Sequence, residues 1–152
     1  MKLFKYLLFI ALFAGITVPL LTSCSNDDDE ALPIEGYWYQ IDERDSPVSY
    51  TMWVFKNGKY ASVYTYKSYI TKSELKECVD KAFRSNKVSN SSVYISDKGT
   101  YTLKGKKLKL ADIDGDVDYV YVSFQKSNSV MVWDDGDHDE EWRWYLQRYT
   151  EE

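Results

Sequence analysis

This 152-residue chain has a single histidine, and it has none of the catalytic sequence motifs considered below. The one histidine, His138, stands in an acid-rich stretch with no cysteine or second histidine at metal-ligand spacing. No nucleophile elbow, glycine-rich phosphate loop or metalloprotease helix motif occurs. A lone histidine in an acidic loop is more often a surface residue than a catalytic base. We therefore expect a non-catalytic protein with no cofactor and no metal.

Basic side chains are also in the minority. The chain has 19 lysines and arginines against 24 aspartates and glutamates, for a formal net charge of −5. An excess of negative charge disfavours nucleic acids and anionic lipid surfaces as partners. Electrostatics therefore gives no reason to expect a nucleic-acid-binding protein.

The N-terminus has the layout of an export signal. Lys2 and Lys5 provide a basic start, residues 6–18 are apolar, and Pro19 and small residues follow. An uncleaved membrane helix is the alternative, because residues 6–22 approach the lower limit of about 17 residues for a bilayer span. Pro19 and polar residues at the end of this run make it a poor span. Both interpretations place the rest of the chain outside the cytoplasm.

The segment Leu21-Thr22-Ser23-Cys24 resembles the lipobox of bacterial lipoproteins. The resemblance implies removal of residues 1–23 as a signal peptide and lipidation of Cys24. Two or more acyl chains would anchor the protein stably, at about 0.8 kcal/mol per buried methylene. Residues 24–31 include four acidic residues, so we expect them to be a solvated tether. They also resemble the export signal of surface lipoproteins in Bacteroidetes-type bacteria, which implies the outer membrane and favours the cell surface over a periplasm-facing position.

One cysteine remains if Cys24 carries lipid. Cys78 then has no partner for an intramolecular disulfide, so the exported domain depends on its hydrophobic core. Cys78 lies within an apolar pattern, where a buried, inert thiol is expected. Residues 32–152 have a length suited to one domain.

The body of the chain has the pattern of an all-β protein. Short runs rich in Tyr, Val, Trp and Thr alternate with Gly, Asn, Asp and Ser. The expected strands are 34–41, 49–56, 59–67, 92–96, 99–104, 107–112, 116–124, 129–134 and 141–149.

Two dipeptides predict tight hairpins. Asn57-Gly58 suits a type I′ turn, in which both central residues have positive φ. That turn pairs Phe55 with Tyr60 and places Trp53, Phe55, Tyr60 and Tyr64 on one side of the ribbon.

Asp114-Gly115 predicts a second hairpin of the same kind. It would place Leu110 opposite Tyr119 and Leu108 opposite Tyr121, which gives a second apolar face.

One segment predicts a helix. Thr71-Lys72-Ser73-Glu74 has the spacing of a capping box, and an apolar stripe follows up to about residue 86. We expect this helix to lie over one mouth or side of the strands, as packing rather than as a lid.

Three segments of the sequence resemble lipocalins. Ile34-Glu35-Gly36-Tyr37-Trp38 is similar to their Gly-x-Trp opening strand, 55–60 to the second hairpin of bacterial lipocalin-like domains, and 99–110 to a later hairpin. The resemblance implies an antiparallel up-and-down barrel of about eight strands, which has no open edges and can hold one small ligand. It also implies that Arg148, or else Arg143, packs over Trp38. The mid-chain helix departs from the lipocalin pattern, so the ligand entrance is not carried over.

The rings suggest where a ligand would bind. Beyond the signal segment, tyrosine and tryptophan far outnumber phenylalanine, so most rings carry a polar atom. The candidate ligand-binding residues are Trp53, Phe55, Tyr60, Tyr64, Tyr119, Tyr121, Trp142 and Trp144.

Three functions fit these residues, and ordinary core packing is the plain alternative to all of them. The first is a module that binds a small hydrophobic or amphipathic molecule. The second is a cell-envelope interaction protein with a filled barrel, such as an accessory subunit or inhibitor. The third is a surface glycan binder that uses Trp133, Trp142 or Trp144.

Two turns are rich in acids, one at 112–118 and one at 134–140. Oxygen-rich loops suit Ca²⁺. However, strand alternation would place Asp112 and Asp118 on different faces, and the EF-hand glycine is missing. We therefore expect solvated turn acids rather than a calcium site.

Overall fold

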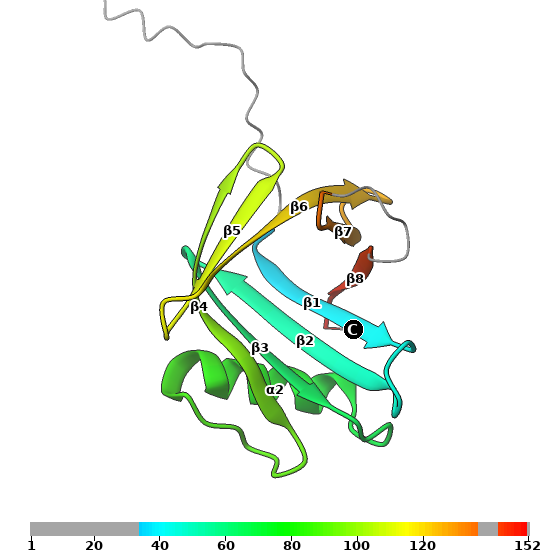
Figure 1. The fold of residues 1–152 in the computed structure, drawn as a ribbon. Coiled ribbons are helices and arrows are strands. Elements are labelled where there is room, and N and C mark those ends of the chain that lie inside the picture. Colours follow the sequence, from blue (N-terminus) through cyan, green and yellow to red (C-terminus); the bar gives the residue numbers. More distant parts are fainter. Residues whose placement is uncertain (1–33, 137–142, 152) are drawn as a thin grey trace, which may run out of the picture. The chain divides into compact units, whose positions relative to one another are not determined.

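Eight antiparallel strands close into an up-and-down barrel in the computed structural model, which describes residues 34–136 and 143–151 (Figure 1). They are β1 (Gly36–Asp42), β2 (Ser49–Lys56), β3 (Lys59–Thr65), β4 (Tyr94–Lys104), β5 (Lys107–Asp112), β6 (Val117–Gln125), β7 (Val130–Asp134) and β8 (Trp144–Tyr149). Each strand pairs with the next, and β8 pairs with β1. The predicted fold class is confirmed.

The strand β4 corrects one detail of the prediction. The segments 92–96 and 99–104 were expected as separate strands, but they form one strand of 11 residues. A β-bulge interrupts its pairing with β3 between Ser62 and Val63. The extra residue of a bulge disturbs the alternation of side chains, and this makes one bent strand look like two in the sequence.

The inward-facing side chains form one of two hydrophobic clusters, which we call the inner cluster. Its members come from all parts of the barrel, because alternate residues of each strand point inward. The inner cluster consists of Ile34, Trp38, Trp53, Phe55, Tyr60, Leu108, Leu110, Val122, Met131, Trp133 and Leu146.

The single helix of the described chain, α2 (Lys72–Ser85), lies outside the barrel, against β2 and β3 (Figure 1). The predicted capping box is present, since Thr71 Oγ1 accepts from the Glu74 amide and Glu74 accepts from the Thr71 amide. The helix buries Leu75, Cys78 and Val79. An outer cluster joins them to the outward-facing side chains Tyr39, Met52, Val54, Ala61 and Val63. The helix therefore covers a side of the barrel and not one of its two ends.

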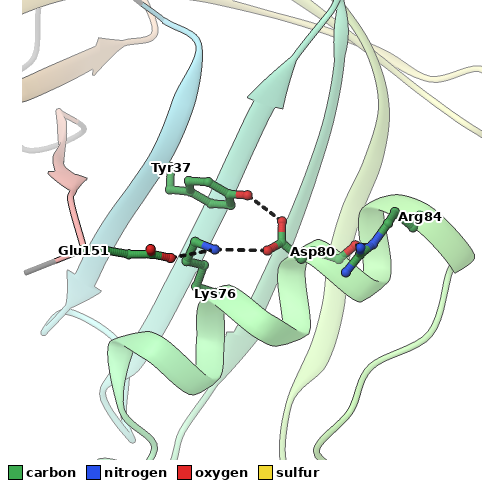
Figure 2. A network of polar contacts seen from close by, with 5 residues as sticks. All are labelled: Tyr37, Lys76, Asp80, Arg84 and Glu151. Atoms are coloured by element: carbon green, nitrogen blue, oxygen red, sulfur yellow. Dashed lines mark hydrogen bonds and ion pairs between the residues drawn. The ribbon is translucent and has the colours of Figure 1, made fainter.

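A polar network fastens α2 to the barrel (Figure 2). The hydroxyl of Tyr37 on β1 donates to Asp80 on the helix. Lys76 lies between two carboxylates, 3.2 Å from Asp80 and 3.0 Å from Glu151 near the C-terminus. Both ends of the barrel sequence are thus tied to one face of the helix.

The β2–β3 hairpin has the predicted turn and register. Asn57 and Gly58 have φ values of 52° and 71°, as a type I′ turn requires. Phe55 pairs with Tyr60, and Trp53 pairs with Ser62. The prediction of one shared face for these rings is confirmed.

The predicted register of the β5–β6 hairpin is wrong by one residue. Leu110 pairs with Asp118 and Leu108 pairs with Val120, not with Tyr119 and Tyr121. The cause is the turn: the Asp112 amide donates to the Asp116 carbonyl, which leaves a three-residue loop in which only Gly115 has a positive φ. A three-residue loop shifts the pairing relative to a two-residue turn, and a shift of one residue reverses which face each side chain occupies.

Candidate ligand cavity at the mouth of the barrel

The barrel interior is open at one end and packed at the other. We call the end where β1, β3, β5 and β7 finish the mouth, and the opposite end the closed end. A cavity of about 770 Å³ occupies the mouth. That volume lies within the range of about 300 to 1,000 Å³ typical of small-molecule sites.

The closed end is filled by side chains of the inner cluster. Trp38, Phe55 and Leu146 there are fully buried. The Trp38 indole donates to the Ile34 carbonyl at 2.7 Å. The guanidinium of Arg148 lies over the Trp38 ring at 4.4 Å, so the resemblance-based expectation for Arg148 is met and that for Arg143 is not. A ligand would therefore reach the interior from the mouth.

Tryptophans from β2, β7 and β8 make the apolar wall of the cavity. Trp53 and Trp133 meet edge to face with ring centres 4.8 Å apart, and Trp133 lies parallel to Trp144 at 6.2 Å. Trp53 and Trp133 are 6% and 5% exposed, while Trp144 is 36% exposed. The wall thus runs from the barrel interior out to solvent.

Two of these tryptophans carry an unused donor. The indole N–H groups of Trp53 and Trp133 are buried and have no acceptor among the described residues. Buried polar groups normally find a partner, and an unmet one costs about 1–3 kcal/mol.

The facing wall is acidic. Asp97 on β4, Asp112 on β5 and Asp118 on β6 all line the cavity, on three neighbouring strands. Beneath them, the Tyr60 hydroxyl donates to Asp97 at 2.6 Å. Burial raises the pKa of Tyr60, and its hydrogen bond to Asp97 and the charges of Asp97, Asp112 and Asp118 raise that pKa further. All three carboxylates of this wall thus raise the pKa of one buried hydroxyl.

Other aspartates of the mouth are paired with arginine. Asp42 binds Arg44 at 2.8 Å, and Asp134 binds Arg143 at 3.0 Å. The hydrogen bond from Arg44 lowers the pKa of the Asp42 carboxyl. These pairs neutralise part of the mouth, but the arginines themselves are not among the lining residues.

The structure distributes the predicted site residues over three environments. Trp53, Tyr64 and Trp144 line the cavity. Phe55 and Tyr60 lie in the inner cluster below it, with Tyr60 stacked 6.1 Å from Trp53.

For two other predicted site residues the predicted orientation is wrong, and a third lies outside the residues that the structure describes. The shifted β5–β6 register turns Tyr119 and Tyr121 outward, where they are 51% and 44% exposed. Tyr119 still borders the cavity rim, but Lys107 covers its ring at 4.5 Å. Trp142, like Cys24 and His138, lies outside the described residues.

The acidic wall was not predicted from the sequence. Strand alternation predicted Asp112 and Asp118 on different faces, yet both point inward, because Leu110 pairs with Asp118 and Gly99 with Asp112. A signal was present in β4, where Asp97 precedes Gly99, Tyr101 and Leu103 with the same alternation.

Comparisons with protein-family models, curated proteins and solved structures gave no match. Within the two described ranges, no helix is long and apolar enough to span a membrane. Over the same residues, no three side chains of the types His, Cys, Asp or Glu converge as a metal-binding group. Among the described residues, the cavity is the feature that bears most directly on function.

Proposed function

We propose that this chain is an outer-membrane lipoprotein whose lipocalin-like barrel binds a small hydrophobic or amphipathic molecule in the mouth cavity. The observation that carries the proposal is the unfilled volume of about 770 Å³ beside three tryptophans. Burial of ligand surface against such rings contributes about 25 cal/mol per Å² of apolar area. The role is binding rather than catalysis.

A neutral fluorescent probe tests this function. N-phenyl-1-naphthylamine, which brightens in apolar surroundings, should bind the purified protein saturably. Thr51 points into the cavity, so Thr51→Trp would place an indole ring in the binding space and should weaken the binding. Thr102 is exposed on the outer face of β4, and Thr102→Trp is the matched control that should leave binding intact. Equal probe binding by the two variants would contradict the proposal.

The membrane anchor is a separate part of the proposal and rests on the sequence. Cys24→Ala should move the protein from the membrane fraction into the soluble or unprocessed fraction, because the acyl chains would have no attachment site. Cys78→Ala, which removes the buried thiol of α2, should leave membrane attachment unchanged. Retention of mature, membrane-bound Cys24→Ala protein would rule out lipidation at this residue.

A cell-envelope interaction protein is the second candidate, and the outer face of β6 and β8 favours it. Tyr119, Tyr121 and Tyr145 are each close to half exposed there. Aromatic side chains of this kind are enriched in protein interfaces. Cross-linking on intact cells tests this candidate: Tyr121→Ser and Tyr145→Ser together should abolish a specific adduct, while Thr51→Trp should not.

A further inference from the structure

We infer that the ligand of the mouth cavity is an organic cation, in which a protonated amine or quaternary ammonium group is joined to an apolar body. The inference rests on the proposed function and names the ligand class for the same cavity. It follows from the separation of carboxylates and rings onto facing walls.

Negative charge in the cavity is not balanced from within. Seven aspartates line it, and the lining contains no lysine or arginine among the described residues. Asp42 and Asp134 have arginine partners, as described above. Asp97, Asp112 and Asp118 have no ion-pair partner in the described chain, so these three carboxylates contribute unneutralised negative charge to the cavity.

The contacts of Asp97 and Asp112 leave the charge of these two carboxylates in place. Asp97 accepts from the neutral Tyr60 hydroxyl, and Asp112 accepts from the backbone amides of its own turn. The nearest lysine in sequence, Lys98, points away, because its ammonium donates to the Ala82 carbonyl of α2.

A cationic group would be stabilised beside this wall. Like charges gathered in a partly desolvated recess raise one another's energy, and an opposite charge within about 4–6 Å lowers it. A recess lined by one sign of charge also concentrates ions of the opposite sign. The acidic wall therefore selects for positive charge and against carboxylates and phosphates.

The tryptophan wall favours a ligand that has an apolar body, which a metal ion does not have. Indole faces attract organic cations and pack against apolar groups. The indole N–H groups of Trp53 and Trp133 have no acceptor among the described residues. Since the described carboxylates do not converge on one point, the arrangement suits an extended organic cation better than a bare metal ion.

Three probes with the same apolar body test the charge preference. They are 1-naphthylmethylamine as the cation, 1-naphthalenemethanol as the neutral analogue and 1-naphthaleneacetate as the anion, titrated calorimetrically into the purified protein. The amine should bind at least about tenfold more tightly than the alcohol, and the acetate more weakly than both, as expected for an ion facing several carboxylates. Added salt should weaken amine binding and leave alcohol binding nearly unchanged.

Two variants near the β5–β6 turn distinguish the effect of a carboxylate in the cavity wall from the effect of the protein's net charge. Asp118 lines the cavity and Asp116 does not, although both are exposed aspartates of the β5–β6 turn region. Asp118→Asn should reduce the preference for amine over alcohol by about threefold or more, because one unpaired charge of the cavity wall is lost. Asp116→Asn makes the same change in net charge and should leave the preference unaltered.

The possible results distinguish the two proposals. Equal affinity for all three probes, or tighter binding of the acetate, would overturn the ligand class while the binding function stands. An equal effect of the two aspartate variants would also overturn it, since net charge would then explain the preference. Absence of binding by all three probes, together with failure of the neutral dye, would remove the binding function and the ligand class alike.

Discussion

The guanidinium of Arg148 on β8 lies 4.4 Å from the centre of the Trp38 ring on β1, where the last strand closes on the first. Arg148 also donates to the carbonyls of Glu35 and Asn128, each at 3.1 Å. Partial burial lowers the pKa of the Arg148 guanidinium. One side chain thus covers a ring, bonds two chain segments and seals the closed end of the barrel.

Removal of Arg148 should therefore destabilise the whole barrel. Arg148→Ala is expected to lower the free energy of unfolding by about 2 kcal/mol, through the lost cation–π contact and two unpaired carbonyls. Lys104 is exposed near the same end of the barrel, and Lys104→Ala should change the free energy of unfolding by less than about 0.5 kcal/mol. Urea denaturation followed by tryptophan fluorescence measures both. Equal midpoints for the two variants would show that Arg148 does not hold the closure.

The start of α2 gives a second prediction. Thr71→Ala removes the acceptor for the Glu74 amide and should lower the free energy of unfolding by about 1 kcal/mol. Ser73→Ala, at an exposed position inside the first turn, should cost little or nothing. Thermal unfolding of the two variants provides the measurement. A larger loss for Ser73→Ala would mean that the cap is not what stabilises the helix.

At Gly99 the backbones of β4 and β5 leave no room for a side chain. A Cβ atom at this position would lie 1.9 Å from the Ala111 carbonyl oxygen, and backbone cannot yield as a side chain can. Gly99→Ala should therefore force the strands apart beside the acidic wall and lower the free energy of unfolding by at least about 2 kcal/mol. Calorimetric unfolding tests this. A melting temperature within error of the unmodified protein would show that the two strands are not in this contact.

The buried hydroxyl of Tyr60 predicts a loss of stability at alkaline pH. Its pKa is raised above the ordinary 10.0 in the folded state, so the unfolded chain releases this proton first as the pH rises. The stabilisation is complete below about pH 10 and is lost progressively above it. Denaturant midpoints measured from about pH 9 to pH 11 should fall steadily.

The variant Tyr60→Phe isolates this contribution. It should be less stable at neutral pH by about 1–2 kcal/mol, because Asp97 loses a donor, but its alkaline decline should be shallower. Burial also raises the pKa of Tyr101, to about 12, so the decline is reduced rather than abolished. An identical alkaline slope in the variant would exclude Tyr60 as a source.

Local patterns predicted most of the fold. The alternation of residues, the Asn57-Gly58 turn and the capping box at Thr71 each depend on a few neighbouring residues, and all three agree with the structure. The closure of β1 on β8 came from the resemblance to lipocalins, because contacts over such a sequence separation leave no local pattern.

The candidate site was predicted less completely, for a physical reason that lies in one turn. Asp-Gly occurs in two-residue type I′ turns and also in three-residue loops with a glycine at positive φ, and the choice between them sets the register of all of β6. The wrong register sent Tyr119 and Tyr121 inward and concealed the shared face of Asp112 and Asp118. The aromatic wall was found in part because Trp53 lies beside the unambiguous turn.

The most direct test of the central claim follows the indole N–H signals of ¹⁵N-labelled protein by NMR as 1-naphthylmethylamine is added. The N–H signals of Trp53 and Trp133, assigned with Trp→Phe variants, should shift, because both line the cavity and have no acceptor in the described chain. The Trp38 signal should stay in place, since that N–H donates to Ile34 at the closed end. Unmoved signals from both cavity tryptophans would contradict the account, and so would a shift confined to residues of the outer face.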